Sequence, residues 1–314
     1  NLKLNIKPIP GLNYQQVVGY ENRQWELHQY WPSTHRSEID NSRKGHAHLA
    51  FSKTENLTSE GYFSYVKDFK GGHNLNATAG YSYFEVNGEN FGMDNYNFSV
   101  DGIKYWDIGQ GSYLTDGKAG MSSGKSVTER LFSFFARANY SYQDKYMLSA
   151  SIRHEGSSKF AADNRWANFW SATAGWRISN EEFMKDFDWL DDLKIRFGYG
   201  VTGNNDFSAT YMANMLGSDT NWMMPNGTWA YSYGKSQNVN PNLGWEEKKE
   251  WNLGVDYSFF EGRLYGKFDY YRREVDNLLF SVKVPQPPYT QGSQMQNIGS
   301  MESNCLLYTS PSPR

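Results

Sequence analysis

The chain has 314 residues and a formal net charge of −3, and it carries no basic block, which excludes an electrostatic surface for nucleic acid. Aromatics make up 17% but all hydrophobic residues only 39%, a composition typical of β structure rather than of helix bundles. The single cysteine, Cys305, excludes an internal disulfide, and no apolar run approaches the roughly 20 residues that a membrane helix needs.

In chain order, alternating apolar and polar residues predict a series of β-strands. Residues 132–142 and 146–153 both alternate and are separated only by a short polar stretch, so we predict a hairpin there. The same pattern marks further segments: residues 75–83, 170–178, 193–201, 251–259 and 264–270. Such strands exceed the usual length of about 5–6 residues in soluble sheets. They match the about 9–11 residues that a tilted strand needs to cross a bilayer.

The connections between these strands alternate between short and long, as they do in membrane barrels. Short turns are predicted near residues 8–11, 67–72, 143–145 and 261–262, a compact helical segment at 180–190, and long segments at 23–54, 86–127, 156–167 and 203–247. Short and long connections alternate only if residues 46–52, which look strand-like, belong to a loop. We therefore predict an all-β fold, a partial antiparallel transmembrane β-barrel of about ten strands with an open edge at each side.

Several segments, taken in order, resemble one transporter family. They are residues 144–153 (DKYMLSASIR), 156–160 (GSSKF), 164–166 (NRW), 174–179 (AGWRIS), 193–196 (LKIR), 199–204 (YGVTGN) and 240–246 (NPNLGWE). The ordered set over residues 57–302 resembles the barrel of the SusC/RagA family of TonB-linked outer-membrane proteins of Bacteroidetes.

The resemblance implies that the chain is part of a roughly 22-stranded barrel plugged by an N-terminal domain. It also implies an outer-membrane location, energy from TonB, a SusD-like lipoprotein over the outer loops, and uptake of oligosaccharides or peptides. We expect the signal peptide, the plug domain and the TonB-contacting segment to be absent here. We assign residues 1–302 to the barrel domain. Residues 303–314 have two prolines and no alternation, so we expect an aberrant, non-family tail that forms no strand.

No motif in the sequence indicates catalysis, a cofactor or a metal site. Residues 198–203 match G-x-G-x-x-G, but they lie in a predicted strand and no helical pattern follows, which argues against nucleotide binding. The adjacent acids Glu181 and Glu182 are placed in the first turn of a short helix, where acids favour the helix dipole. His46 and His48 share one face of an extended segment but lack a third ligand, which favours a solvated loop over a zinc site.

Aromatic residues in the long loops are candidates for substrate binding, because sugars stack on such rings. These candidates are Trp106, Tyr113, Trp222, Trp229 and Tyr231, with Tyr233 nearby. Packing within the loops, or contact with the lid partner, is the favoured alternative. On the strands, polar-face cations are expected to face the lumen and outward aromatics to form an interface girdle. The cations are Arg137, Arg153, Arg177, Lys194 and Arg196, and the aromatics are Tyr140, Tyr142, Tyr146 and Phe259.

Two other kinds of protein are compatible with strands of this type. A secreted, soluble carbohydrate-binding β-protein would cover the apolar faces with a second layer. A barrel enzyme would need a convergent nucleophile and base, and none is evident. We therefore predict a non-enzymatic outer-membrane nutrient importer. Its expected partners are a SusD-like lipoprotein, TonB, outer-membrane lipid and an oligosaccharide or peptide substrate.

Overall fold

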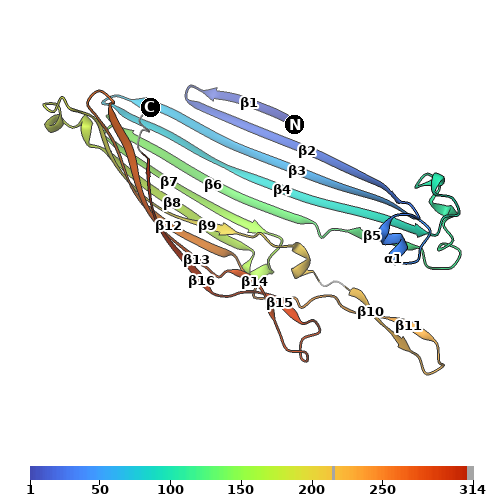
Figure 1. Cartoon of the computed structure of the whole chain (residues 1–314). Coiled ribbons are helices and arrows are strands. Elements are labelled where there is room, and N and C mark those ends of the chain that lie inside the picture. The colour runs from blue at the N-terminus through green and yellow to red at the C-terminus, as the bar shows by residue number, and fades with distance from the viewer. Residues whose placement is uncertain (214–215, 310–314) are drawn as a thin grey trace. The chain divides into compact units, whose positions relative to one another are not determined.

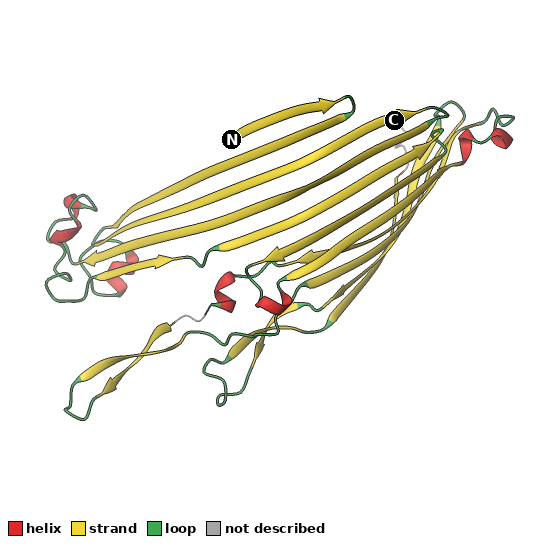
Figure 2. Ribbon diagram, turned by 180° about the vertical axis from the view of Figure 1, so that it is seen from behind, coloured by secondary structure: helices red, strands yellow, loops and turns green. Residues whose placement is uncertain are grey.

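The computed structural model describes residues 1–213 and 216–309, and its regular structure is nearly all β (Figures 1 and 2). The strands are β1 (Leu2–Ile9), β2 (Leu12–Trp31), β3 (His46–Phe69), β4 (His73–Tyr96), β5 (Gly120–Lys125), β6 (Glu129–Tyr142), β7 (Tyr146–Ser157), β8 (Trp166–Arg177), β9 (Leu190–Asn204), β10 (Leu216–Met223), β11 (Trp229–Lys235), β12 (Glu246–Phe259), β13 (Leu264–Asp276), β14 (Leu279–Lys283), β15 (Ser293–Asn297) and β16 (Ser300–Thr309).

Helical structure in the described residues is short. It comprises α1 (Arg36–Asp40) and the 3-10 turns η1 (Asp101–Ile103), η2 (Ile108–Gln110), η3 (Ala162–Asn164), η4 (Ile178–Asn180), η5 (Glu182–Met184) and η6 (Ala209–Met212). Across residues 1–213 and 216–309, no helix has the length and apolar character needed to cross a membrane.

The chain divides into two compact units. Unit 1 comprises Asn1–Val18, Thr58–Phe84 and Arg130–Arg314, and unit 2 comprises Gly19–Leu57 and Glu85–Glu129. The long strands β2, β3 and β4 contribute residues to both. Unit 2 also contains α1, η1, η2 and β5, whereas unit 1 contains the strands from β7 to β16.

Most strands belong to one 12-stranded sheet. Its order is β1-β2-β3-β4-β6-β7-β8-β9-β12-β13-β16, with β5 pairing β4 off this path, and the hairpins β10–β11 and β14–β15 form separate sheets. The registers from β6 to β16 are antiparallel between every pair of neighbours. The prediction of an antiparallel all-β sheet is therefore confirmed, and the path holds eleven strands where the sequence predicts about ten.

Strand β16 is the additional strand, and it corrects the prediction for the tail. Residues 303–309 were expected to form no strand, but Ser300–Thr309 pairs with β13 from Asp276 to Lys267. The ladder uses backbone groups, so weak alternation of side chains does not prevent pairing with an existing edge. The two tail prolines, Pro311 and Pro313, lie outside the described residues.

Two local predictions in the connections are also wrong. Residues 46–52 were kept in a loop, but β3 begins at His46 and the preceding connection covers only residues 32–45. The polar side chains at this end find partners on β4, so polarity does not end the strand: His46 and His48 each place a ring nitrogen 2.8 Å from Asp94 Oδ1. The helical segment expected at residues 180–190 contains the single 3-10 turns η4 and η5 instead. The connection that holds them, residues 178–189, is longer than the connection at residues 158–165 that was expected to be long, so short and long connections do not alternate strictly.

The main buried apolar cluster of unit 1 lies among its long connections. It consists of Phe160, Phe169, Phe207, Leu243, Trp245 and Met295. The Trp245 ring lies 4.8 Å from Phe160 and 5.2 Å from Phe169, and its Nε1 donates a hydrogen bond of 3.0 Å to the Arg165 carbonyl. One residue of the NPNLGWE motif thus joins its own connection to the connection between β7 and β8 and to β8 itself.

Replacing Trp245 with Ala should destabilise this cluster strongly. A buried Trp-to-Ala change typically lowers the free energy of unfolding by about 3–5 kcal/mol. Denaturant unfolding of the complete protein in detergent, followed by limited proteolysis of the connections, would measure the loss. The control is Trp229→Ala, because that side chain is 68% exposed and should cost less than about 0.5 kcal/mol. Equal stability of the two variants would contradict the structural role of Trp245.

Candidate functional site

The strands of unit 1 present an apolar face that is exposed. One row of neighbouring residues crosses seven strands on this face: Tyr140, Leu148, Ala174, Phe197, Leu253, Tyr270 and Leu306. Along β7, exposure alternates, with Leu148 and Ile152 exposed and the polar residues between them half-buried. In the described part of unit 1, no second layer covers this row. The second layer expected for a soluble β-protein is therefore absent from this part of the chain.

The opposite, polar face carries ion pairs. The Arg196 guanidinium lies 2.9 Å from Asp256 Oδ2 and 3.1 Å from Asp269 Oδ1, and so bridges the two strands that follow β9 in the sheet. Arg273 Nε lies 2.8 Å from Glu250 on the neighbouring strand. A sheet with charged pairs on its half-buried face and apolar rings on its exposed face has the inverted arrangement of a membrane barrel.

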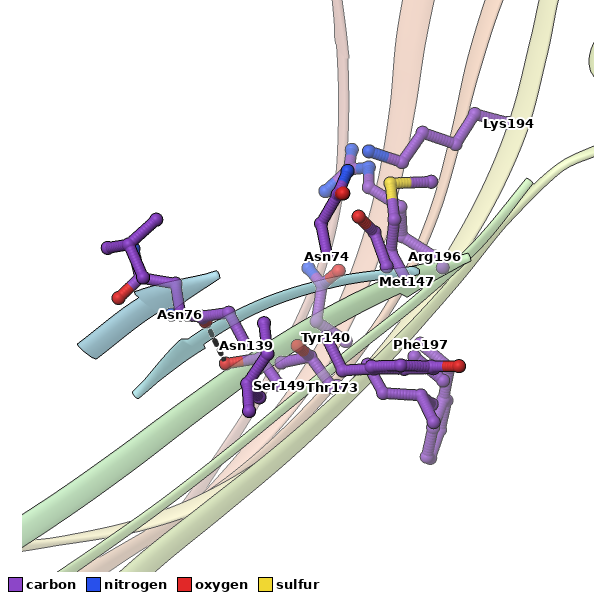
Figure 3. Close-up of a pocket in the computed structure, with 18 of the residues that line it drawn as sticks. Asn74, Asn76, Asn139, Tyr140, Met147, Ser149, Thr173, Lys194, Arg196 and Phe197 are labelled. Carbon is purple, nitrogen blue, oxygen red and sulfur yellow. Dashed lines mark hydrogen bonds between the residues drawn. The ribbon is translucent and has the colours of Figure 1, made fainter. Parts of the chain in front are cut away.

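A cavity of about 490 Å³ lies against the polar face and is shown in Figure 3. Its labelled lining includes Asn74, Asn139, Ser149, Lys194 and Arg196, and Ser149 Oγ donates a hydrogen bond of 2.7 Å to Asn139 Oδ1. Of the predicted lumen cations, Lys194 and Arg196 line this cavity, and Arg196 is paired with Asp256 and Asp269. Within the described residues, the structure records no hydrogen bond or ion pair for the Lys194 side chain, so this cation is available to a partner.

A second cavity, of about 410 Å³, lies between two long connections of unit 1 and was not found from the sequence. It is lined by Asn240, Pro241, Asn242, Tyr289, Gln294, Gln296 and Asn297, none of which is charged. Some carboxamides are used structurally: Asn240 donates to the Met295 carbonyl, and Asn297 accepts from Gly244 N at 2.7 Å. The Asn242 carboxamide, Gln296 Oε1 and the Tyr289 hydroxyl have no recorded partner among the described residues.

The predicted substrate-binding aromatics are divided between the two units. Trp106 is 77% exposed, and its ring lies 4.8 Å from that of Tyr105 in unit 2. Tyr113, also in unit 2, packs against Tyr96 at 5.2 Å, as the loop-packing alternative expects. Trp229 is exposed on β11 of unit 1. The side chains of Trp222 and Tyr231 lie outside the described residues, and a substrate role for all five stays a prediction.

Unit 2 holds the predicted histidine pair in a stack of rings. The His46 ring lies 4.5 Å from Trp31 and 4.1 Å from Tyr96, and the Arg43 guanidinium covers Tyr96 at 4.4 Å. Asp94 and Tyr96, which complete this cluster, come from the end of β4, a segment that was expected to be a loop. In the part of the chain that the structure describes, no group of three His, Cys, Asp or Glu residues could hold a metal ion.

The other sequence motifs have structural positions. Residues 198–203 lie within β9 and do not open a helix, and a Cβ at Gly203 would overlap the Phe169 ring. The glycine there is explained by close packing rather than by phosphate binding.

Glu181 holds together the short connections at the opposite end of the strands. Its carboxylate accepts hydrogen bonds from Tyr146 Oη at 2.7 Å, Trp176 Nε1 at 3.0 Å and Lys145 Nζ at 3.2 Å. These bonds, that from Tyr146 first, hold the pKa of the Glu181 carboxyl below its ordinary value of 4.5. Sequence reasoning placed Glu181 at a helix start, and nothing in the local sequence indicates these partners.

The lowered pKa of Glu181 predicts a pH dependence of stability. A carboxyl with a lowered folded-state pKa stabilises the fold above its unfolded pKa, and this contribution is lost as pH falls through the folded value. The difference in melting temperature between wild type and Glu181→Gln should therefore shrink below about pH 4.5. Asp188→Asn is the control, because Asp188 has no recorded partner among the described residues. A constant difference for Glu181→Gln across this range would contradict the assignment.

The sequence is similar to those of known proteins. Residues 7–304 match the family described as TonB dependent receptor-like, beta-barrel. The TonB-dependent receptor SusC of Bacteroides thetaiotaomicron is 38% identical over 192 residues, which cover 60% of this chain and 19% of that protein. The TonB-dependent receptor P39 of Formosa agariphila is 32% identical over 313 residues, covering 96% of this chain and 28% of that protein.

Solved structures agree with this similarity. The structure of the RagAB peptide transporter superposes with a TM-score of 0.82 at 25% identity, covering 97% of this chain and 32% of that chain. This chain therefore spans less than a third of the length of these relatives. The resemblance read from the ordered motifs is confirmed, and the family match ends at residue 304, inside β16. The domain boundary at residue 302 stays a prediction.

Proposed function

Because the chain belongs to the TonB-dependent receptor-like β-barrel family, we propose that it forms part of the wall of an outer-membrane importer. The observation that carries this proposal is the exposed apolar face backed by an ion-paired polar face. Exposed side chains of the apolar row, such as Leu148 at 55% and Leu306 at 59%, favour lipid over water. The polar face then lines the lumen, and transport rather than catalysis is the function.

We infer the importer's partners from the family and from the features of the polar face. The cavity beside Lys194 combines polar side chains with an available cation, which suits the surface of a plug domain carrying carboxylates. The plug would connect to TonB, which supplies energy. We infer that a SusD-like lipoprotein covers the long connections at the other end of the strands, as the resemblance to the SusC/RagA family implies.

We infer that neutral oligosaccharides are the substrates, with peptides as the alternative. The second cavity, lined mainly by Asn and Gln side chains and here called the carboxamide cavity, offers Asn242, Gln296 and Tyr289 to a ligand and no charged group. Hydroxyls of a neutral sugar can donate to and accept from carboxamides, whereas the charged ends of a short peptide would find no countercharge there. RagAB, which shares this fold, is a peptide transporter, so peptides need a direct test.

The orientation of the two faces can be tested with paired substitutions. Leu148→Arg puts a cation on the proposed lipid face and should cost about 2–4 kcal/mol near the bilayer midplane. Ser151→Arg on the polar face of the same strand should cost much less. The readout is the heat-modifiable fraction of the complete protein on gels of the outer-membrane fraction. A soluble protein, or equal tolerance of the two changes, would overturn the importer proposal.

The substrate proposal predicts a loss of affinity on removal of the side chains that keep free polar atoms in the carboxamide cavity. Asn242→Ala and Gln296→Ala should each weaken binding of a neutral oligosaccharide by about 2–10-fold, the effect of one hydrogen bond of about 0.5–1.5 kcal/mol. Calorimetric titration of the complete protein with neutral oligosaccharide and peptide mixtures would measure this. Asn226→Ala, in the β10–β11 turn, is the control. Binding of peptides alone would favour the alternative substrate.

A further inference from the structure

The connection between β14 and β15 places one aromatic side chain at the carboxamide cavity; both strands are labelled in Figure 1. This side chain belongs to Tyr289, which is 36% exposed. Among the described residues, the structure records no contact between its ring and another aromatic ring or a cation. Aromatic packing within this part of the chain therefore does not account for the ring, and its surface is available to a ligand.

Hydrogen bonds from a buried asparagine hold this connection in place. Asn238 Nδ2 donates to the carbonyls of Gln291 at 2.7 Å and Ser293 at 2.9 Å. Its Oδ1 accepts from Thr290 Oγ1 at 3.1 Å and from Gln291 N at 3.2 Å. Thr290 and Gln291 directly follow Tyr289 in the chain, so the aromatic side chain extends from an ordered backbone. Binding of a ligand would then cost little conformational entropy of the connection.

The carboxamide cavity combines two kinds of surface. Every lining residue other than Tyr289 and Pro241 is Asn or Gln. Gln296 Nε2 donates to Gln294 Oε1 at 2.9 Å, which leaves Gln296 Oε1 and the Asn242 carboxamide as the polar atoms without a recorded partner among the described residues. Apolar ring surface therefore lies beside uncharged groups that can still form hydrogen bonds.

A pyranose sugar has the same division of surface. When its hydroxyls are equatorial, they point outward from the edge of the ring, and the C–H groups are left on the two faces. The face of an aromatic ring carries partial negative charge, which attracts such C–H groups. The hydroxyls at the edge can both donate to and accept from carboxamides. A furanose ring offers the same hydroxyl chemistry but no comparably flat C–H face.

We propose that Tyr289 determines the specificity of the carboxamide cavity, by stacking its ring on the C–H face of a pyranose with equatorial hydroxyls. Asn242 and Gln296 then bind the hydroxyls at the edge of the same sugar. The inference rests on the proposed import of neutral oligosaccharides. It adds a preference for pyranose over furanose units, which carboxamides alone would not produce, because the hydroxyls of both sugars form the same kinds of hydrogen bond.

Calorimetric titration of the complete protein with two neutral tetrasaccharides tests the proposal. Cellotetraose consists of pyranose units with equatorial hydroxyls, whereas most units of nystose are furanoses. The wild type should prefer cellotetraose. Tyr289→Ala should weaken cellotetraose binding by about 3–10-fold, the effect of one aromatic contact, and should reduce the preference over nystose. Tyr289→Leu should behave in the same way, because it keeps apolar bulk but has no aromatic face.

Two further variants serve as controls. Tyr289→Phe keeps the ring and should keep the preference for cellotetraose. Phe183→Ala removes a side chain that is 60% exposed on the connection between β8 and β9 and does not line the cavity, so it should change neither affinity. Limited proteolysis of the β14–β15 connection shows whether each variant retains the fold held by Asn238.

The outcomes separate this inference from the proposed function. If the wild type binds a neutral tetrasaccharide and Tyr289→Ala and Tyr289→Leu bind it equally well, the role of Tyr289 is wrong and the proposed substrate class stands. An equal loss in Tyr289→Phe and Tyr289→Ala would assign the effect to the hydroxyl and would also overturn stacking. A wild-type protein that binds neither tetrasaccharide would contradict the substrate proposal, and the inference with it.

Discussion

The backbone hydrogen-bond ladder is the constraint on which the rest of unit 1 depends. Because neighbouring strands satisfy each other's N–H and C=O groups, the sheet needs no apolar core between two layers. Its side chains can then be inverted, with rings outward and ion pairs such as Arg196–Asp256 on the other face. The same property lets β16 extend the sheet although its sequence is a poor match to the pattern.

Apolar packing acts at the ends of the strands instead. The cluster around Trp245 joins connections that are far apart in the chain, and Glu181 performs the corresponding task at the short turns through hydrogen bonds. Backbone hydrogen bonds between the strands hold the sheet together, whereas the Trp245 cluster and the Glu181 hydrogen bonds hold its connections in place. Motif residues that mark the family, such as Leu243 and Trp245, are therefore explained by packing within the protein rather than by contact with a substrate.

The sequence predicts the strands well where alternation is strict, as in β6 and β7, because a two-residue period reports directly on two different environments. It fails where partners distant in the chain decide the outcome. The extension of β3 depends on Asp94 from β4, and β16 depends on the free edge of β13. The carboxamide cavity combines residues about fifty positions apart, which no local pattern can reveal. The loop aromatics were proposed as substrate ligands from their residue type alone. Their spacing in the sequence does not show that they belong to two separate units.

The carboxamide cavity has one consequence for how such proteins diversify. Asn240 and Asn297 use their side chains to bind backbone groups and hold the frame, while Asn242 and Gln296 keep free polar atoms on that frame. Mutations at the second pair can change the pattern of donors and acceptors without unfolding the connection. Mutations at the first pair alter the frame itself. Stability of the frame and, under the proposed function, ligand recognition thus fall to different residues of the same two segments, which gives selection a route to new specificity with little loss of stability.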